Sequence, residues 1–485
     1  MMITPVGLIL IPLGIIFFIK GKKYLFWSVI ATSPLTEVEI LKLSMIAEVL
    51  PAFYFGGLLI LKHTIDKAFN ASQKKQYIFA SEHKILIIFL FVSLASILMP
   101  FILEGTKVYT FGGESFLAIA TYGYDALTQP LNFSISNITQ YIYLLFVTIL
   151  FFLLSRYYYN NPKRIYTTIK IFVAISLIVL SQQLINEFLY LSNNMFITKY
   201  VNYFQKGTFE LYSTRGSSAY LMRGFTILGE PGHTSVFHLT CFGIAFAFIF
   251  NLKHLDKKFK KYALMYFLCM LLSLLMTLST TAYVGLLIFF TSALFVLIIQ
   301  KLQWPYTLSL KFVSLSLFTM LISTLFIIGL MYSLNINFLH LLYEKHLNKL
   351  LLEAGSGAVR YSLAINSLEL LKSSPLLGLG YGSARSTSGF ITILTNTGIL
   401  GGFVFSCFYF ILFKKSLYLY RSLIFKMLSS FMLSSSLLII TYFSLFVIAK
   451  AISMLLFIYT WVIFAMISGL YLSYTRNHFS KINKM

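Results

Sequence analysis

The sequence predicts an all-α polytopic integral membrane protein. Of its 485 residues, 58% are hydrophobic and only 11% are charged, whereas an ordinary soluble domain has about 25% charged residues. Apolar runs of about 17 to 22 residues recur along the chain, which is the length an α-helix needs to cross about 30 Å of hydrocarbon. Because lipid offers no hydrogen-bond partner to the backbone, we expect each run to be a helix.

These runs predict about 13 transmembrane helices in a single transmembrane domain that covers residues 1–485. The predicted spans are approximately 4–19, 24–43 (broken near Pro34), 44–61, 85–103, 139–155, 165–186, 234–251, 262–278, 282–300, 312–331, 389–413, 427–447 and 451–471.

The distribution of basic residues predicts the orientation of the chain in the membrane. Alternate connectors and the C-terminal tail hold 25 of the 38 Lys and Arg residues and only 3 acidic residues, whereas the other connectors hold 11 basic and 9 acidic residues. Basic loops stay on the cytoplasmic side, so we expect a cytoplasmic C-terminus. The net charge of +23 is thereby explained by topology, and it indicates no nucleic-acid partner.

Three connectors on the outer side are too long for simple turns: the first outer loop 104–138, and two loops expected to carry function, 187–233 and 332–388. Helix connections usually take about 2 to 8 residues. In the third loop, apolar residues at helical spacing predict a short amphipathic helix over 339–350. A second short helix is expected from an N-cap at Ser356 to the stop before Pro375.

Arg360 lies in the first turn of that second helix, where the helix dipole disfavours a cation. A bound phosphate or diphosphate would remove the conflict, because the free amides of the first turn and the guanidinium both attract an anion. The alternative is that Arg360 extends to lipid headgroups.

The stretch "RGFTILGEPGHTSVFH" gathers ionisable residues at the start of the predicted span 234–251. Pro231 suits the first position of a helix, which places Glu230 just outside it, near Arg223 and His233. Ionisable groups at a membrane boundary are candidates for function. The alternative is a salt bridge between Glu230 and Arg223 that holds the loop.

We expect no metal site and no cofactor. His233 and His238 are five residues apart, which does not match the spacing of a metal-binding pair on a helix. Cys241, Cys269 and Cys407 lie inside predicted spans without a CxxC spacing, so we expect them to pack in the core.

Two further polar segments are notable. The sixth span ends in "SQQLINEF", whose Gln183 we expect to face the interior of the bundle and to form one wall of a site. The glycines of "GLGYGS" at 378–383 follow no strand, so they do not indicate a dinucleotide site, and we interpret them as a flexible backbone near a phosphate.

The motifs "RGFTILGEPGHTS" and "RYSLAINSLELLKSSPLLGLGYGS" followed by "ITILTNTGILGG" resemble the bacterial O-antigen polymerase and ligase superfamily. The resemblance covers roughly residues 215–402. It implies a GT-C-like glycosyltransferase of the bacterial inner membrane, whose site faces the periplasm and uses no metal. Its substrates would be oligosaccharides on undecaprenyl diphosphate, and a chain-length regulator and a flippase of the same pathway would be its partners besides membrane lipids.

The resemblance also implies roles for individual arginines. Arg223 and Arg360 match the arginines that bind the diphosphate in the family, and Arg215 and Arg385 are weaker matches. Ligases tend to carry His-Asn where this chain has Thr387 and Ser388. This departure favours a polymerase over a ligase.

The expected chemistry needs a stabilised leaving group, a base and surfaces for sugar rings. Arg223 and Arg360 would supply the first by fixed positive charge. Glu230 is the expected base and His233 the second candidate. Tyr220, Tyr361 and Gln183 complete the residues expected to bind substrate.

Two alternatives stay open at this point. A ligase would transfer the same glycan to lipid A core. A flippase of lipid-linked oligosaccharide would carry charges spread through its spans, whereas here the predicted intramembrane charges are few, with Glu48, Lys170 and Lys450 among them.

Overall fold

The computed structural model describes most of the membrane-embedded chain. The described residues are 2–36, 38–42, 48–69, 79–104, 109–111, 128–191, 231–252, 255–277, 279–303, 364–384, 386, 388–423, 426–448 and 457–482.

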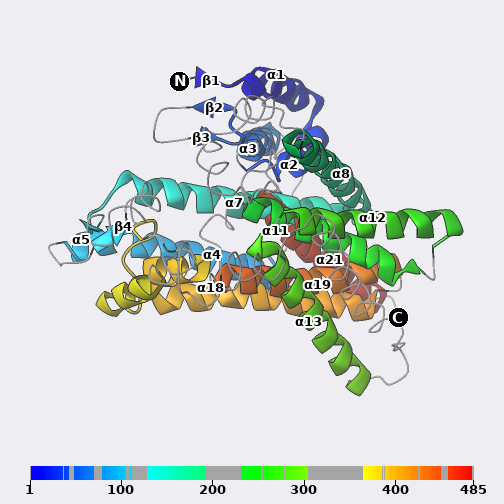
Figure 1. The fold of residues 1–485 in the computed structure, drawn as a ribbon. Helices are drawn as coiled ribbons and strands as arrows, with labels where there is room; N and C mark the ends of the chain where they lie inside the picture. Colours follow the sequence, from blue (N-terminus) through cyan, green and yellow to red (C-terminus); the bar gives the residue numbers. More distant parts are fainter. Residues whose placement is uncertain are drawn as a thin grey trace.

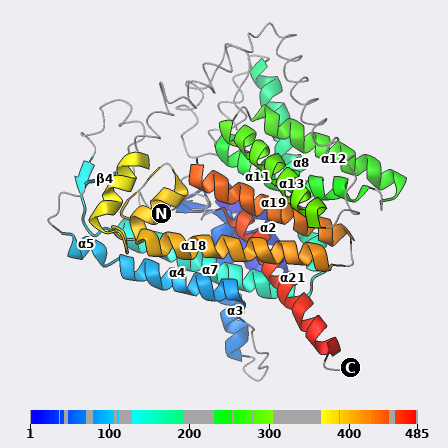
Figure 2. The ribbon, with the colours of Figure 1, turned by 90° about the horizontal axis from the view of Figure 1, so that it is seen from below.

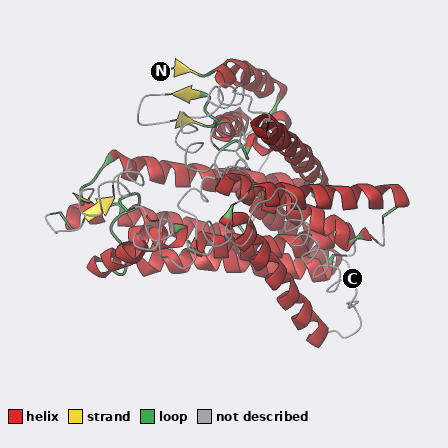
Figure 3. Ribbon diagram, in the orientation of Figure 1, coloured by secondary structure: helices red, strands yellow, loops and turns green. Residues whose placement is uncertain are grey.

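The described chain is predominantly α-helical (Figures 1 and 3). Its helices are α1 (Pro5–Lys20), α2 (Lys22–Thr32), α3 (Pro51–Phe69), α4 (Ser81–Ser96), α5 (Met99–Ile102), α7 (Ile135–Asn160), α8 (Arg164–Leu191), α11 (Pro231–Phe250), α12 (Lys257–Met276), α13 (Thr280–Gln303), the 3-10 turn η4 (Leu371–Ser373), α18 (Gly389–Ser422), α19 (Lys426–Ile448) and α21 (Ile458–Ile482). Two small antiparallel sets accompany them: β1 (Met2–Ile3), β2 (Leu41–Lys42) and β3 (Glu48–Val49), and β4 (Tyr109–Phe111) with β5 (Thr128–Pro130).

Eight of the described helical segments are long and apolar enough to cross a membrane. The chain is therefore a polytopic α-helical membrane protein, as its composition predicts. The predicted span 312–331 lies outside the described residues, so the total of about 13 spans stays a prediction.

The break near Pro34 in the second predicted span is confirmed, and the third span begins later than predicted. Helix α2 ends at Thr32, and its C-cap Ser33 still has helical backbone, with φ −56° and ψ −29°. Pro34 follows, which has no N–H to continue the helix, and the chain then becomes extended and enters β2. The next helix, α3, starts at Pro51, seven residues later than predicted, with proline at its first position.

The long helices α4, α7, α18 and α19 run side by side (Figures 1 and 2). Helix α21 packs along α7, and α11 lies at the centre, against α8, α12, α13 and α19. Nearly every side chain of α11 is buried, including Cys241, which packs in the core as expected.

Hydrogen bonds, ion pairs and ring contacts between the helices sort the helix ends into two opposite groups. We call the ends near residues 20–23, 62–69, 81–84, 156–164, 414–422 and 474–482 the basic end. There, Lys22 Nζ lies 2.9 Å from Asp66 Oδ2, and Arg476 Nη1 donates to Tyr159 Oη at 2.9 Å. We call the opposite group, near residues 96–102, 131–137, 231–238, 273–283, 375–392 and 447–460, the loop end.

An ion pair is buried at the basic end between α4, α18 and α21. Lys415 Nζ donates to Glu82 Oε2, and Ser468 Oγ donates to Glu82 Oε1. The Glu82 side chain is fully buried and that of Lys415 is 9% exposed. The ammonium also lies 4.4 Å from the centre of the Tyr471 ring. Three helices that are distant in sequence thus share one charge pair.

Helix α18 reverses direction at Gly398, whose φ is 68° and ψ is −173°. A β-carbon built on Gly402 would lie 3.8 Å from Cζ of Phe390 and would overlap Leu394. In a straight helix, residues 390 and 402 would be about 18 Å apart at 1.5 Å per residue. The predicted span 389–413 is therefore corrected: its first part folds back, and only the part after Gly398 runs on to Ser422.

The segment 375–380 closes this reversal by pairing with backbone groups on both sides of Gly398. Leu379 N–H donates to Thr395 O at 2.8 Å and Gly380 N–H to Asn396 O at 3.1 Å. In return, Ile399 N–H donates to Pro375 O at 2.8 Å. The carbonyl groups that end one helical part and the amide that begins the next would otherwise lack partners, so the segment caps both.

Replacing Gly398 by alanine is expected to destabilise the protein. The left-handed backbone alone costs about 1–2 kcal/mol with a β-carbon, and that carbon would also overlap the carbonyl oxygen of Leu376. Thermal unfolding in detergent should give a lower Tm for Gly398→Ala. The control is Gly57→Ala in α3, whose β-carbon would meet no atom within 4 Å and which should keep or raise the Tm. Equal Tm values would contradict the reversal.

Removing one partner of the buried ion pair is expected to cost about 3–5 kcal/mol. Lys415→Met leaves the Glu82 carboxylate buried without its cation, whereas the double variant Glu82→Gln, Lys415→Met removes both charges and should recover part of the loss. Lys414→Met, at the exposed neighbouring position, is the control. Unfolding of the unchanged protein, the single variants Glu82→Gln and Lys415→Met and the double variant measures the coupling, and additive effects of the two substitutions would show that no pair exists.

Candidate functional site

Most residues singled out by the sequence lie outside the described part of the chain. These are Arg215, Tyr220, Arg223, Glu230, Arg360, Tyr361, Arg385 and the expected N-cap Ser356. Gln183 and His233 are described, and both lie in helices that meet at the loop end.

Helix α11 begins at Pro231, which confirms the predicted helix start. Glu230 therefore directly precedes a helix in the sequence. His233, in the first turn, packs its ring edge-on against Phe457 at the start of α21, with 5.1 Å between the ring centres. This contact holds the first turn of α11 against another helix start.

A buried polar network lies one turn further along α11. His238 Nε2 and Ser273 Oγ of α12 are 2.7 Å apart, and Ser273 Oγ donates to Gln183 Oε1 of α8 at 3.0 Å. Gln183 Nε2 donates back to Ser273 O at 3.2 Å. All three side chains are at most 2% exposed. Gln183 thus faces the interior, as predicted, and His238 is a hydrogen-bonded packing residue.

Among the described residues, two buried polar atoms beside this network find no hydrogen-bond partner: His238 Nδ1 and the hydroxyl of Tyr459. Phe237, which precedes His238 on α11, packs edge-on against Tyr459 of α21, with 5.5 Å between the ring centres. An unpaired buried polar atom costs about 1–3 kcal/mol, so these atoms mark the place where a water or a polar ligand group would be most favoured.

Ser235 and Thr277 extend the polar surface towards the loop end. Ser235 Oγ donates to Thr277 Oγ1 at 3.1 Å, between the first turn of α11 and the end of α12. Asn186, one turn beyond Gln183 on α8, is also buried. Polar side chains from α8, α11 and α12 therefore gather on the interior side where these helices reach the loop end.

Ser388 has a structural role at the start of α18. Its hydroxyl accepts from Ile391 N at 3.3 Å, as an N-cap, and donates to Val447 O of α19 at 2.6 Å. It is 3% exposed. At the position where ligases carry the second residue of their His-Asn pair, this chain thus has a buried cap, while Thr387 lies outside the described residues.

The glycines of the "GLGYGS" segment have a structural reason of their own, and the expected place of this backbone near a phosphate stays a prediction. Gly378, Gly380 and Gly382 have φ values of 68°, 109° and 86°. A β-carbon on Gly380 would lie 2.6 Å from Pro100 Cδ, and one on Gly382 would lie 2.8 Å from Ser136 O. The glycines are needed for close packing and left-handed backbone.

Two asparagines hold this segment from both sides. Asn396 accepts from Ala384 N–H at 2.7 Å and donates to Ala384 O at 2.8 Å. Asn137 of α7 donates to Tyr381 O at 2.8 Å and to Ser383 Oγ at 2.7 Å. Ala384 directly precedes Arg385, so the backbone before this arginine is fixed.

Helix starts and helix ends meet at the loop end. Helices α11, α18 and α21 begin there, where a helix start carries a partial positive charge, whereas α12 and α19 end there, where a helix end carries a partial negative charge. In the described part of the chain, no group of three His, Cys, Asp or Glu side chains is arranged to hold a metal ion. The network of His238, Ser273 and Gln183 at this end is one of uncharged hydrogen-bonding groups.

Sequence reasoning missed two features of the described residues. Ser273 is one hydroxyl in a run of leucines, which resembles an ordinary helix serine until its partners are known. Glu82 and Lys415 lie in predicted cytoplasmic connectors, where exposed charges are the rule. Only the packing of α4 against α18 brings them together.

Replacing Ser273 by alanine is expected to destabilise the protein by about 1–3 kcal/mol, because it leaves His238 and Gln183 buried without their shared partner. Ser181→Ala on α8 is the control, since Ser181 is exposed and bonds only within its own helix. Thermal unfolding should separate the two variants. The same Tm for both would mean that the network adds nothing to stability.

In comparisons of sequence, the chain matches no protein family model, and no curated protein matches it significantly.

Proposed function

We propose that this protein is an O-antigen or related surface polysaccharide polymerase. It would transfer a glycan from undecaprenyl diphosphate to another lipid-linked repeat unit, as a GT-C-like glycosyltransferase without metal or cofactor. One observation carries the proposal: the two motifs on which the resemblance rests, "PLLGLG" and "TGILGG", cap each other at the reversal of α18. The first motif lies between Arg360 and Arg385 in the sequence, and the second begins 12 residues after Arg385.

The proposed reaction breaks the bond between the anomeric carbon and the diphosphate oxygen. A hydroxyl of the acceptor sugar forms the new glycosidic bond and loses its proton to Glu230, with His233 as the second candidate base. The diphosphate leaves with the electron pair of the broken bond. Arg223 and Arg360 would stabilise its growing negative charge, and Arg215 and Arg385 would support them.

Two observations on the described residues support this chemistry. His233 lies in the first turn of α11, whose start carries a partial positive charge, and Glu230 directly precedes that helix in the sequence. The buried network of Gln183, Ser273 and His238 would form the inner wall, and Tyr220 and Tyr361 would stack on sugar rings. The expected place is the periplasmic face of a bacterial inner membrane, with a flippase and a chain-length regulator as partners.

A ligase would use the same donor and the same leaving group. Ser388 favours the polymerase, because its hydroxyl is committed to the start of α18 and to Val447 of α19. The product separates the two reactions: a ligase makes glycan on lipid A core, and a polymerase makes longer glycan on the lipid diphosphate.

Variants of the proposed residues test the assignment. Purified protein with an undecaprenyl-diphosphate repeat unit and no added metal should give a ladder of longer glycans on a gel. Arg223→Ala, Glu230→Ala and Arg360→Ala should each reduce elongation by about 100-fold or more. His233→Ala separates the two candidate bases.

Lys372→Ala is the matched control, because Lys372 is an exposed basic residue of the same outer loop, paired only with Glu369 at 3.4 Å. It should elongate as the unchanged protein does. Full ladders from the three site variants would refute the residue assignment, and no ladder from the unchanged protein would refute the polymerase.

A further inference from the structure

A cavity of about 270 Å³ lies at the basic end, between the start of α2, the second half of α3, the end of α7 and the start of α8. Four basic residues line it: Lys22, Lys23, Arg156 and Arg164. None of the nine described residues that form its lining is acidic. Cations from two connectors that are more than 130 residues apart thus surround one space.

Two of these cations are held against aromatic rings. Arg164 Nη1 donates to Tyr157 O at 3.0 Å, and its guanidinium lies 4.2 Å from the centre of the Tyr157 ring. Lys23 Nζ lies 4.6 Å from the centre of the Trp27 ring. Stacked and hydrogen-bonded cations lose little side-chain entropy when a ligand arrives.

The negative charge beside the cavity is small. Asp66 pairs with Lys22 at 2.9 Å and also lies 3.8 Å from Lys62, so one carboxylate is shared by two lysines. The pKa of His63, which lines the cavity, is lowered by burial and then by the charges of Lys22, Arg156 and Lys67, although Asp66 opposes them. The field in the cavity is therefore positive, and an anion would be attracted.

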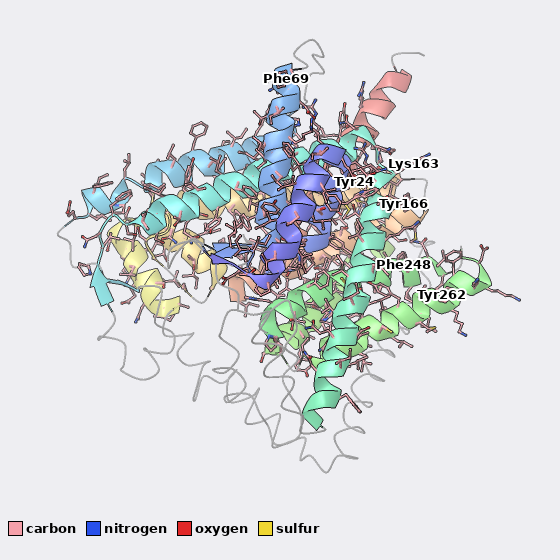
Figure 4. The ribbon with its side chains drawn as sticks, turned by 90° about the horizontal axis from the view of Figure 1, so that it is seen from above. Tyr24, Phe69, Lys163, Tyr166, Phe248 and Tyr262 are labelled. Atoms are coloured by element: carbon pink, nitrogen blue, oxygen red, sulfur yellow. The ribbon has the colours of Figure 1, made fainter. Side chains whose placement is uncertain are left out.

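The cavity has an apolar side as well, formed by Phe26 and Leu153. Tyr24 and Tyr166, near the starts of α2 and α8, are 36% and 38% exposed. Figure 4 shows them on neighbouring helices, beside Lys163. Exposed tyrosines near basic residues mark the level of lipid headgroups, so the cavity lies where a lipid phosphate meets its first acyl carbons.

We propose that this cavity binds the phosphate of an anionic membrane lipid such as phosphatidylglycerol. Basic pockets between transmembrane helices on this side of a membrane suit acidic headgroups. Free inorganic phosphate has the same charge chemistry, but it would leave the apolar side unused. The site lies at the end opposite the proposed glycosyl transfer, and it does not depend on that function.

The test is retention of lipid by the full-length protein in detergent, measured by native mass spectrometry. Phosphatidylglycerol, phosphatidylcholine and inorganic phosphate are the three probes. The unchanged protein should retain one phosphatidylglycerol, should not retain phosphatidylcholine, and should keep its lipid in equimolar phosphate. The double variant Arg156→Gln, Arg164→Gln should bind about tenfold more weakly or worse.

Two further variants keep the result interpretable. Lys23→Gln changes an exposed side chain that contacts only the face of the Trp27 ring among the contacts described above, and it should weaken binding several-fold even if the double variant fails to fold. Lys258→Gln, Lys261→Gln removes two exposed charges at the start of α12, outside the cavity, and should bind normally. Equal losses in cavity and control variants, or complete displacement by phosphate, would overturn the proposal.

Discussion

The loop end of this protein depends on the pairing of backbone groups at the reversal of α18. A helix can turn back in a membrane protein only if the amide and carbonyl groups freed at the turn find partners, since lipid offers none. Residues 375–380 supply those partners, and Asn396 and Asn137 then fix the chain that follows. The positions of α18 against α19 and of the outer segment against α7 both follow from this one constraint.

The two ends of the bundle are stabilised by different kinds of polar interaction. At the basic end, charges are paired or stacked, as in the buried contact of Glu82 with Lys415. At the loop end, the described interior around α11 is built from hydroxyl, amide and imidazole groups, and the start of α11 carries a partial positive charge. An anionic substrate there would meet uncharged hydrogen-bonding groups, and the proposed arginines of the outer loops would supply the full positive charges.

The sequence predicts the fold class and most helix positions because apolar runs of spanning length have one stable solution in lipid. The start of α11 was predictable from Pro231, whose fixed φ suits a first helical position. The reversal at Gly398 was not predictable from the sequence. Hydropathy carries no information on the direction of the chain, and the run 389–413 is apolar on both sides of the turn. The network around Ser273 was also hidden, since it needs three helices to meet, and Gln183 alone indicated it. Of the candidate site, the sequence supplies the ionisable residues but no distances between them.

The capping at Gly398 joins main chain to main chain, and this has a consequence for how such a protein can change over time. A substitution that keeps the glycines and adds no proline leaves the paired amides in place, so most side chains here are less constrained than Asn396 and Ser388, which form hydrogen bonds themselves. An insertion or deletion within 375–380 or within 395–399 would shift donors past their acceptors. The length of these two segments is therefore fixed more strictly than most of their side chains, and relatives that share the corner are better recognised by spacing than by identity.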